Sequence, residues 1–376
     1  MRGLKVLTVI GTRPEAIKLA PVLLEFRRRP AQFRSFVCAT GQHRQMLDQV
    51  LPVFDIQADH DLGLMLPRQS LAQITARAVE GLNKIIEQES PDVVLVQGDT
   101  TTAFCGALAA YYHKKKVAHV EAGLRTGNRF APFPEEINRR LISSLTDYHF
   151  APTDRAKAAL LAEGVSASSV FVTGNTVIDA LFWVRDRVRS RQPDLPYGLA
   201  QELDGNQVVL VTGHRRESFG KGFENICGAI REIADAFSNV LFIYAVHLNP
   251  HVREPVNRIL GGHKRIRLIE PQPYLSFVWL MDRATILLTD SGGVQEEAPS
   301  LGKPVLVMRE TTERPEGVAA GNARLVGVRK EGIAAELIRL LEDAKERAAM
   351  GSTSNPYGDG RAAMRIADAL HRVRLI

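Results

Sequence analysis

The sequence predicts an α/β protein with two Rossmann-like domains, whose parallel sheets face a central cleft. Short runs rich in Val, Ile and Phe alternate with helical patterns, which is typical of parallel strands buried on both faces. The alternation stops in the Pro- and Gly-rich segment 189–206, which we interpret as surface or linker, and then restarts. A length of 376 residues suits two domains, each with its own core.

The expected strands fall into two sets, and helices are expected over 331–350 and 360–373. The strands of the first set are Leu4–Ile10, Arg34–Thr40, Asp92–Gln97, Val117–Val120, Tyr148–Phe150 and Val170–Val172. Those of the second set are Gln207–Val211, Val240–Ala245, Ile266–Ile269, Thr285–Thr289, Pro304–Val307 and Ala323–Val326. We expect one domain over 1–177 and a second domain over 178–360, with the C-terminal helix of about 361–376 packing back on the first.

The composition argues against a membrane protein and against a nucleic-acid-binding protein. No apolar run approaches the ~20 residues of a membrane span, so no membrane partner is expected. The net charge of +6 is modest for this length, and its basic runs lack interleaved aromatic residues, so nucleic acid is not expected either. Three widely spaced cysteines, Cys38, Cys105 and Cys227, favour a reducing cytoplasm and a place in the core.

Two glycine-containing motifs follow predicted strands and have the chemistry of phosphate sites. Gly11-Thr-Arg-Pro-Glu-Ala-Ile-Lys18 opens a helix whose free N–H groups could face an anion, with Arg13 and Lys18 nearby. It is not Gly-x-Gly-x-x-Gly, which argues against a nicotinamide cofactor. Ser291-Gly-Gly-Val-Gln-Glu-Glu297 would let a pyrophosphate approach its backbone, and Glu297 could accept from both hydroxyls of a ribose. A capped helix with no ligand is the alternative for both.

Acidic side chains gather in loops that follow strands of the first domain. Asp99, Glu121 and Glu135 occupy consecutive loops, which makes a proton donor or acceptor near neutral pH plausible. Asp99 could instead simply cap the next helix. His214, in Thr212-Gly-His-Arg-Arg-Glu217, faces the cleft from the second domain and could bind phosphate or serve as an acid.

Metal binding is not expected. Asp59-His-Asp61 matches the Asp-x-Asp string of some sugar transferases, but it follows no clear strand. No other cluster of His, Cys or Asp has the spacing of metal ligands.

Six motifs together resemble the bacterial non-hydrolysing UDP-N-acetylglucosamine 2-epimerases, in register from about Leu4 to Gly327. The motifs are Gly11-Thr-Arg-Pro-Glu, Gln97-Gly-Asp-Thr-Thr-Thr, His119-Val-Glu-Ala-Gly-Leu-Arg-Thr, Pro132-Phe-Pro-Glu-Glu-Ile-Asn-Arg, Gly213-His-Arg-Arg-Glu and Asp290-Ser-Gly-Gly-Val-Gln-Glu-Glu. The resemblance implies a glycosyltransferase-B type fold and interconversion of UDP-GlcNAc and UDP-ManNAc without NAD, metal or another cofactor.

The family's route implies elimination of UDP to a bound 2-acetamidoglucal, followed by re-addition with reprotonation of C2 from the other face. By resemblance, Asp99, Glu121, Glu135 and His214 are the catalytic residues. The order of base and acid among the carboxylates stays open. The residues implied to contact the nucleotide are Arg13, Lys18, Gln272, Phe277, Ser291, Gly292, Gly293, Glu297 and Arg314.

The resemblance also implies a second, activating site for UDP-GlcNAc. It corresponds to Gln42, His43 and Gln45, together with Arg68 and His247. A helix N-terminus is the alternative for the first of these segments. The family further implies a homodimer and a product that feeds a cell-surface polysaccharide.

Three other functions stay open. A glycosyltransferase of the same fold would move the sugar to an acceptor, whereas the closely spaced acidic residues favour epimerisation. A hydrolysing epimerase would release ManNAc and UDP, whereas the activator-like motif favours the non-hydrolysing kind. A non-catalytic sugar-nucleotide-binding protein would not need the four candidate catalytic side chains.

Overall fold

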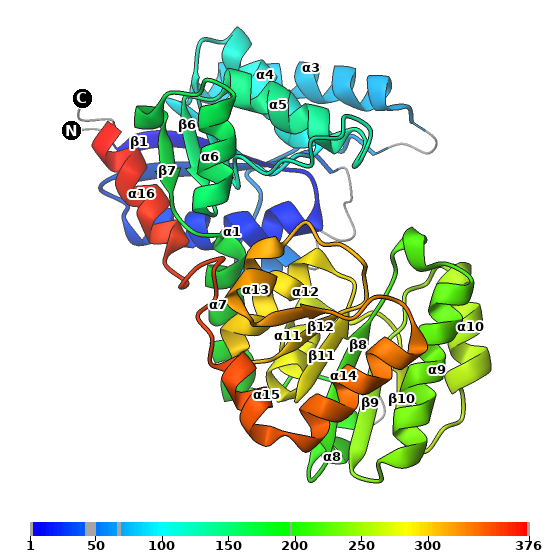
Figure 1. Cartoon of the computed structure of the whole chain (residues 1–376). Helices are drawn as coiled ribbons and strands as arrows, with labels where there is room; N and C mark the ends of the chain where they lie inside the picture. Colours follow the sequence, from blue (N-terminus) through cyan, green and yellow to red (C-terminus); the bar gives the residue numbers. More distant parts are fainter. Residues whose placement is uncertain (1–2, 42–49, 66–68, 196–197, 374–376) are drawn as a thin grey trace. The chain divides into compact units, whose positions relative to one another are not determined.

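The computed structural model describes residues 3–41, 50–65, 69–195 and 198–373, and they form two compact units (Figure 1). Unit 1 takes the described parts of residues 1–180 and 358–376, and unit 2 takes those of 181–357. The last segment of the chain therefore belongs to the same unit as the first.

Unit 1 is built on a sheet of seven strands in the order β3-β2-β1-β4-β5-β6-β7, and all its pairings are parallel. The strands are β1 (Leu4–Ile10), β2 (Phe33–Ala39), β3 (His60–Asp61), β4 (Val93–Gln97), β5 (Lys116–Val120), β6 (Tyr148–Ala151) and β7 (Val170–Val172). The helical elements are α1 (Arg13–Arg28), η1 (Leu51–Phe54), α3 (Leu71–Glu89), α4 (Thr101–Tyr112), α5 (Glu135–Leu145), α6 (Asp154–Ala162), η2 (Ala167–Ser169), α7 (Thr176–Ser190), which continues into unit 2, and α16 (Ala362–Val373).

Unit 2 has a parallel sheet of six strands in the order β10-β9-β8-β11-β12-β13. The strands are β8 (Gln207–Thr212), β9 (Val240–Ala245), β10 (Ile266–Ile269), β11 (Ile286–Thr289), β12 (Val305–Val307) and β13 (Ala323–Leu325). The helical elements are α8 (Leu199–Leu203), η4 (Arg216–Ser218), α9 (Lys221–Ala236), α10 (Pro250–Leu260), α11 (Tyr274–Arg283), α12 (Gly292–Glu297), η5 (Ala298–Leu301), α13 (Pro315–Ala320), α14 (Lys330–Glu342) and α15 (Ala344–Gly351).

The two parallel sheets confirm the predicted fold class, and each of the twelve expected strands is present with bounds that differ by at most one residue. The short strand β3 was not expected. The prediction of one helix over 331–350 was wrong, because Asp343 ends α14 and begins α15. Its side chain accepts hydrogen bonds from the backbone N–H groups of Lys345 and Glu346, both at 2.9 Å, which starts a new helix.

Each sheet has one position where its strand order reverses, between β1 and β4 in unit 1 and between β8 and β11 in unit 2. In open α/β sheets, ligands bind outside the carboxyl ends of the strands at such a position. Gly11 and Gly98 follow β1 and β4, and His214 and Asp290 follow β8 and β11. The chain therefore places several of the predicted site residues at the edge of the sheet where binding is expected.

The cores of both units are apolar, and the three cysteines lie in them with free thiols. Burial raises the pKa of each thiol to about 12, so the thiols are not ionised near neutral pH. Among the described residues, no helix is long and apolar enough to cross a membrane.

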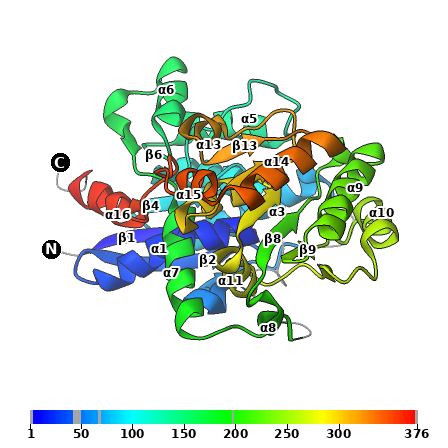
Figure 2. The same ribbon diagram turned by 60° about the horizontal axis from the view of Figure 1, so that its bottom comes forward.

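The final helix, α16, packs beside α1 in unit 1, as both views show (Figures 1 and 2). Arg29, which follows α1, forms an ion pair with Asp368 of α16 at 2.5 Å. At the start of α16, the carboxylate of Asp179 in α7 accepts hydrogen bonds from the backbone N–H groups of Ala362 and Ala363, at 3.1 and 2.9 Å. One side chain of α7 thus caps the helix that returns from the far end of the chain.

We predict that Asp179→Ala lowers the free energy of unfolding by about 1–2 kcal/mol, because two N–H groups of α16 lose their acceptor. Urea unfolding followed by circular dichroism measures the change. Limited proteolysis should then cut the chain near the start of α16. Asp343→Ala is the matched control, since it removes a cap from α15 and leaves α16 attached. Equal resistance of α16 to protease in both variants would contradict the role of Asp179.

Candidate active site

Glu121 is the most enclosed of the predicted catalytic carboxylates. It directly follows β5, is buried, and has a φ of 64°, a left-handed conformation that is unfavourable for a glutamate. Lys18 Nζ of α1 lies 2.5 Å from its Oε1, and Asn175 Nδ2 donates to the same oxygen at 3.3 Å. The Gln97 side chain at the end of β4 donates to Oε2. Three separate segments thus fix this carboxylate.

Asp99 lies in the loop between β4 and α4 and does not cap α4. The N-cap is Thr100, whose hydroxyl accepts from the backbone N–H of Ala103 at 3.0 Å. The Asp99 carboxylate instead pairs with Arg139 of α5, whose Nε and Nη2 lie 2.9 and 2.8 Å from Oδ2. The side chain of Asn138 donates to the Asp99 carbonyl at 2.9 Å. Asp99 is therefore held by α5 at both its backbone and its side chain.

Glu135 is the first residue of α5 and is half-buried. The next residue, Glu136, is fully buried and accepts from the backbone N–H groups of Thr126 and Gly127 at 2.9 and 3.2 Å. Burial opposes ionisation of Glu136, but these backbone hydrogen bonds and the nearby Arg139 hold its pKa below the ordinary value. Glu136 thus anchors the preceding loop, while Asn138 and Arg139, one turn after Glu135, bring the start of α5 beside Asp99.

The Gly11–Lys18 motif differs from the expectation in one respect. The backbone N–H groups of Gly11 and Thr12 are already hydrogen-bonded within the protein, because both donate to Glu15 Oε2, at 3.0 and 2.6 Å. Glu15 is buried, which raises its pKa to about 7 even though several hydrogen bonds favour the ionised form. Arg13 begins α1 and is half-buried, while Lys18 pairs with Glu121. The motif therefore contributes Lys18 as the cation that pairs with Glu121.

In unit 2, Asp290 organises the loop that carries His214. The Asp290 Oδ2 accepts from the backbone N–H groups of His214 and Arg215, at 2.7 and 2.8 Å, and the His214 ring Nδ1 lies 3.1 Å from Oδ1. Burial opposes ionisation, but these contacts with His214 and Arg215 keep the pKa of Asp290 below its ordinary value. His214 stacks on His247, with ring centroids 5.6 Å apart. Burial and the neighbouring His214 lower the pKa of His247.

The second glycine motif of unit 2 lies beside Arg314. The Arg314 Nε donates to Glu296 at 2.5 Å, and a Cβ on Gly292 would lie 3.5 Å from the guanidinium carbon. Gly292 therefore lies beside this cation. Glu297 is buried and accepts from the hydroxyl of Tyr274 at 2.9 Å. Ser291 is the N-cap residue of α12, and Gly293 is exposed.

The two remaining predicted nucleotide contacts lie close together in the chain. The Gln272 side chain donates to the carbonyl of Glu270 at 2.7 Å, and Phe277 is a half-buried residue of α11.

Of the predicted activator residues, only His247 belongs to the part of the chain that the structure describes. Gln42, His43, Gln45 and Arg68 lie outside the described residues.

The segment Asp59–Asp61 has a structural role in this fold. Asp59 Oδ2 accepts from the backbone N–H of Val37 at 2.7 Å, and His60 and Asp61 form the edge strand β3. Within the described ranges, no three His, Cys, Asp or Glu side chains are grouped as a metal ion would need.

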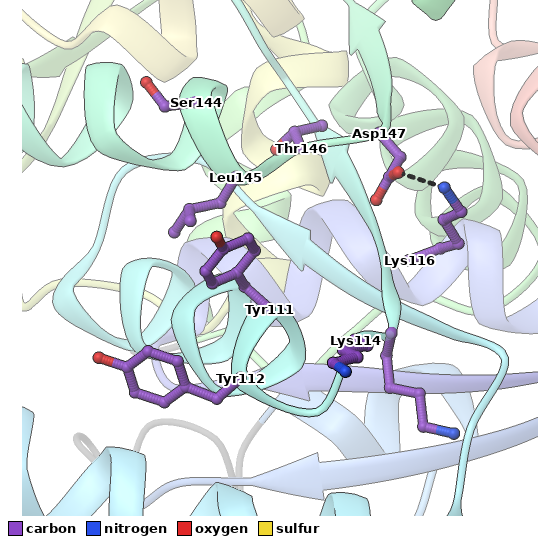
Figure 3. Close-up of a pocket in the computed structure, with 9 residues that line it drawn as sticks. Tyr111, Tyr112, Lys114, Lys116, Ser144, Leu145, Thr146 and Asp147 are labelled. Atoms are coloured by element: carbon purple, nitrogen blue, oxygen red, sulfur yellow. Dashed lines mark hydrogen bonds and ion pairs between the residues drawn. The ribbon is translucent and has the colours of Figure 1, made fainter.

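A surface pocket of about 600 Å³ in unit 1 belongs to the opposite edge of the sheet (Figure 3). It is formed where α4 and α5 end and β5 begins, and Tyr111 and Tyr112 of α4 border it. At its rim, Lys116 donates to Asp147 at 2.7 Å. None of the predicted site residues lines this pocket, so it has no part in the candidate site.

Several residues of the site were not singled out from the sequence. Glu15, Gln97, Asn138, Arg139 and Asn175 each hold a loop or a carboxylate in place. All but Asn175 stand within the six motifs, which is the signal that could have found them. Their partners are far away in sequence, so the motif order alone did not reveal the contacts.

His119, two residues before Glu121, supports the same edge of the sheet. Its Nε2 lies 2.7 Å from the Gly98 carbonyl, so this nitrogen carries the proton and donates. Complete burial lowers the pKa of His119 to about 3. The ring is therefore neutral in the folded protein near pH 7.

We predict that the stability due to neutral His119 is full above pH 6.5 and falls as the pH drops towards 3, because only the unfolded chain readily binds the proton. Between pH 6.5 and 5, the native chain should lose about 2 kcal/mol more unfolding free energy than His119→Gln, whose amide still donates to Gly98. Urea unfolding at several pH values measures this difference. Parallel pH profiles for the two chains would contradict it.

Comparison with known proteins identifies the family of this chain. The family model described as UDP-N-acetylglucosamine 2-epimerase matches residues 25–371. The UDP-N-acetylglucosamine 2-epimerase of Escherichia coli K12 is 56% identical over 380 residues, covering 99% of this chain and 100% of the relative. That of Bacillus subtilis 168 is 51% identical over 371 residues, covering 98% of this chain and 96% of the relative.

A solved structure gives the same result. The UDP-GlcNAc 2-epimerase of Neisseria meningitidis, in a crystal structure bound to UDP-GlcNAc, superimposes with a TM-score of 0.88 at 48% identity. The match covers 98% of this chain and 100% of that one. With a family model over most of its length and relatives of this identity, the chain belongs to the UDP-N-acetylglucosamine 2-epimerase family.

Proposed function

We propose that the protein interconverts UDP-GlcNAc and UDP-ManNAc by eliminating UDP and adding it back. The observation that carries the proposal is the placement of Asp99 and Glu121 at neighbouring strand ends, each held by a cation, Arg139 or Lys18. The Neisseria meningitidis relative, bound to UDP-GlcNAc, supports the choice of substrate. Inversion at C2 needs groups that remove and return a proton, and the carboxylates of unit 1 have this chemistry.

In the elimination step, a carboxylate removes the C2 proton, the C2–H electrons form a C1=C2 double bond, and the C1–O bond to UDP breaks. The products are 2-acetamidoglucal and UDP, both held by the protein. In the return step, an oxygen of the UDP β-phosphate bonds to C1, and C2 accepts a proton from the opposite face. Asp99, Glu121 and Glu135 are the proposed proton-handling groups.

Departing UDP carries negative charge that the protein must stabilise. Arg314, which lies beside Gly292, and the motif Ser291–Gly293 are the proposed diphosphate contacts in unit 2. We assign His214 to the same task or to proton transfer, because Asp290 fixes its backbone and its ring. The remaining proposed nucleotide contacts are Arg13, Lys18, Gln272, Phe277 and Glu297.

Regulation by substrate is a further part of this proposal. His247, proposed to belong to an activating UDP-GlcNAc site, stacks directly on His214. Occupation of that site would therefore act on a proposed catalytic ring through one contact. We also propose that the protein works as a homodimer, as the resemblance implies.

We predict that proton NMR of the protein with UDP-GlcNAc in deuterium oxide, with chelator and without NAD, shows UDP-ManNAc carrying deuterium at C2. Deuterium enters because the C2 proton is removed and exchanges with solvent, and C2 then accepts a solvent-derived deuteron. A reaction started from pure UDP-ManNAc should wait for a trace of UDP-GlcNAc. Free ManNAc with UDP would indicate a hydrolysing enzyme, and no change of substrate would favour a transferase or a binding protein.

We predict that Asp99→Asn lowers kcat by about 10²–10⁴-fold, because the amide cannot take or give the proton. The affinity for UDP, measured by calorimetry, should stay near that of the native chain. Asp147→Asn is the matched control, since it breaks a carboxylate–lysine pair at the other end of the same sheet. Loss of UDP affinity together with activity in Asp99→Asn would make Asp99 a binding or folding residue.

A further inference from the structure

Three consecutive residues of the loop after β4 are each held by a side chain from a different element. His119 Nε2 of β5 donates to the Gly98 carbonyl at 2.7 Å, and Asn138 of α5 donates to the Asp99 carbonyl at 2.9 Å. The Thr100 hydroxyl donates to Glu15 Oε1 of α1 at 2.7 Å. The proposed catalytic Asp99 is thus the middle residue of a loop with three anchors.

Glu15 differs from the other two anchors because it connects two loops. Its Oε2 accepts from the N–H groups of Gly11 and Thr12 after β1, while its Oε1 accepts from Thr100 after β4. Only 1% of its surface is exposed, so water does not compete for these contacts. The carboxylate is therefore a fixed connection across the position where the strand order reverses.

We propose that Glu15 is a positioning residue, which sets the place of the Asp99 carboxylate through the hydroxyl of Thr100. This inference rests on the proposed function. Thr100 has one hydroxyl hydrogen, which it donates to Glu15, while its oxygen accepts from the N–H of Ala103 and caps α4. Glu15 therefore holds the N-cap residue of α4, and Asp99 is the residue directly before it.

The alternative is that Glu15 only stabilises the start of α1 by accepting from Gly11 and Thr12. The two roles involve different oxygens and can be separated. In Glu15→Gln, the remaining oxygen can still accept from Gly11 and Thr12, while the amide group that faces Thr100 cannot accept from its hydroxyl and can only donate to it. The hydrogen bond that places Thr100 is therefore reversed, and the hydroxyl hydrogen loses its acceptor. A role confined to α1 would survive this change, whereas positioning of Asp99 would not.

The experiment compares Glu15→Gln, Thr100→Val and the double variant for kcat, KM, UDP affinity and thermal unfolding. We expect each single variant to lower kcat by about 10- to 100-fold, because small displacements of a catalytic group cost rates of this size. KM and UDP affinity should change by no more than about twofold, since the interaction acts on turnover rather than binding. The double variant should be no slower than the slower single variant, because both remove the same interaction.

Two further variants separate positioning from loss of a helix cap. Thr100→Ser keeps the hydroxyl and should restore kcat. Thr153→Val removes the threonine cap of α6, which accepts from Ala156 at 3.2 Å, and should leave kcat unchanged. If Thr100→Val unfolds, the kcat of Glu15→Gln alone tests the positioning role, because this variant leaves the cap of α4 in place.

Each other outcome has a defined meaning. If the native chain is active and Glu15→Gln keeps its kcat, the positioning role is overturned and the proposed function stands. Multiplicative losses in the double variant, or a fall in UDP affinity that matches the fall in kcat, would also overturn it. A native chain that does not epimerise would overturn the proposed function, and this inference with it.

Discussion

The buried carboxylate of Glu121 is the constraint around which the site of unit 1 is organised. A charged carboxylate removed from water is costly unless it is paired and hydrogen-bonded. Here Lys18, Gln97 and Asn175 supply these contacts from α1, the end of β4 and the segment after β7. The ion pair and hydrogen bonds of Glu121 therefore connect four segments of unit 1 at the carboxyl end of its sheet.

A similar principle operates in unit 2, where Asp290 is a buried carboxylate. It receives two backbone N–H groups and the His214 ring, so the loop after β8 is fixed by the residue that follows β11. In both units a carboxylate connects loops on either side of the reversal of strand order, Glu15 in unit 1 and Asp290 in unit 2. Precise loop placement thus comes from buried side chains rather than from loop sequence alone.

The fold and the location of the candidate site could be predicted from the sequence, but the contacts within the site could not. Strands buried on both faces consist of nearly continuous apolar residues, so their bounds can be predicted from the sequence. The strand β3 was not predicted, because its two residues, His60 and Asp61, have no apolar pattern. A helix cap was the alternative role for Asp99, but Thr100 caps α4, because a cap is chosen by backbone geometry that composition does not encode. The pairing of Arg139 with Asp99 depends on how α5 packs, over a separation of 40 residues.

The path of the chain through the two units has a consequence for synthesis. Unit 2 ends at residue 357, whereas unit 1 includes α16, which begins at Ala362. During translation, all of unit 2 therefore leaves the ribosome before unit 1 has its last helix. Because domains tend to fold as they emerge, the surface of α1 that binds α16 lacks its partner until unit 2 has been synthesised. Synthesis of unit 1 therefore starts before that of unit 2 and is completed after it.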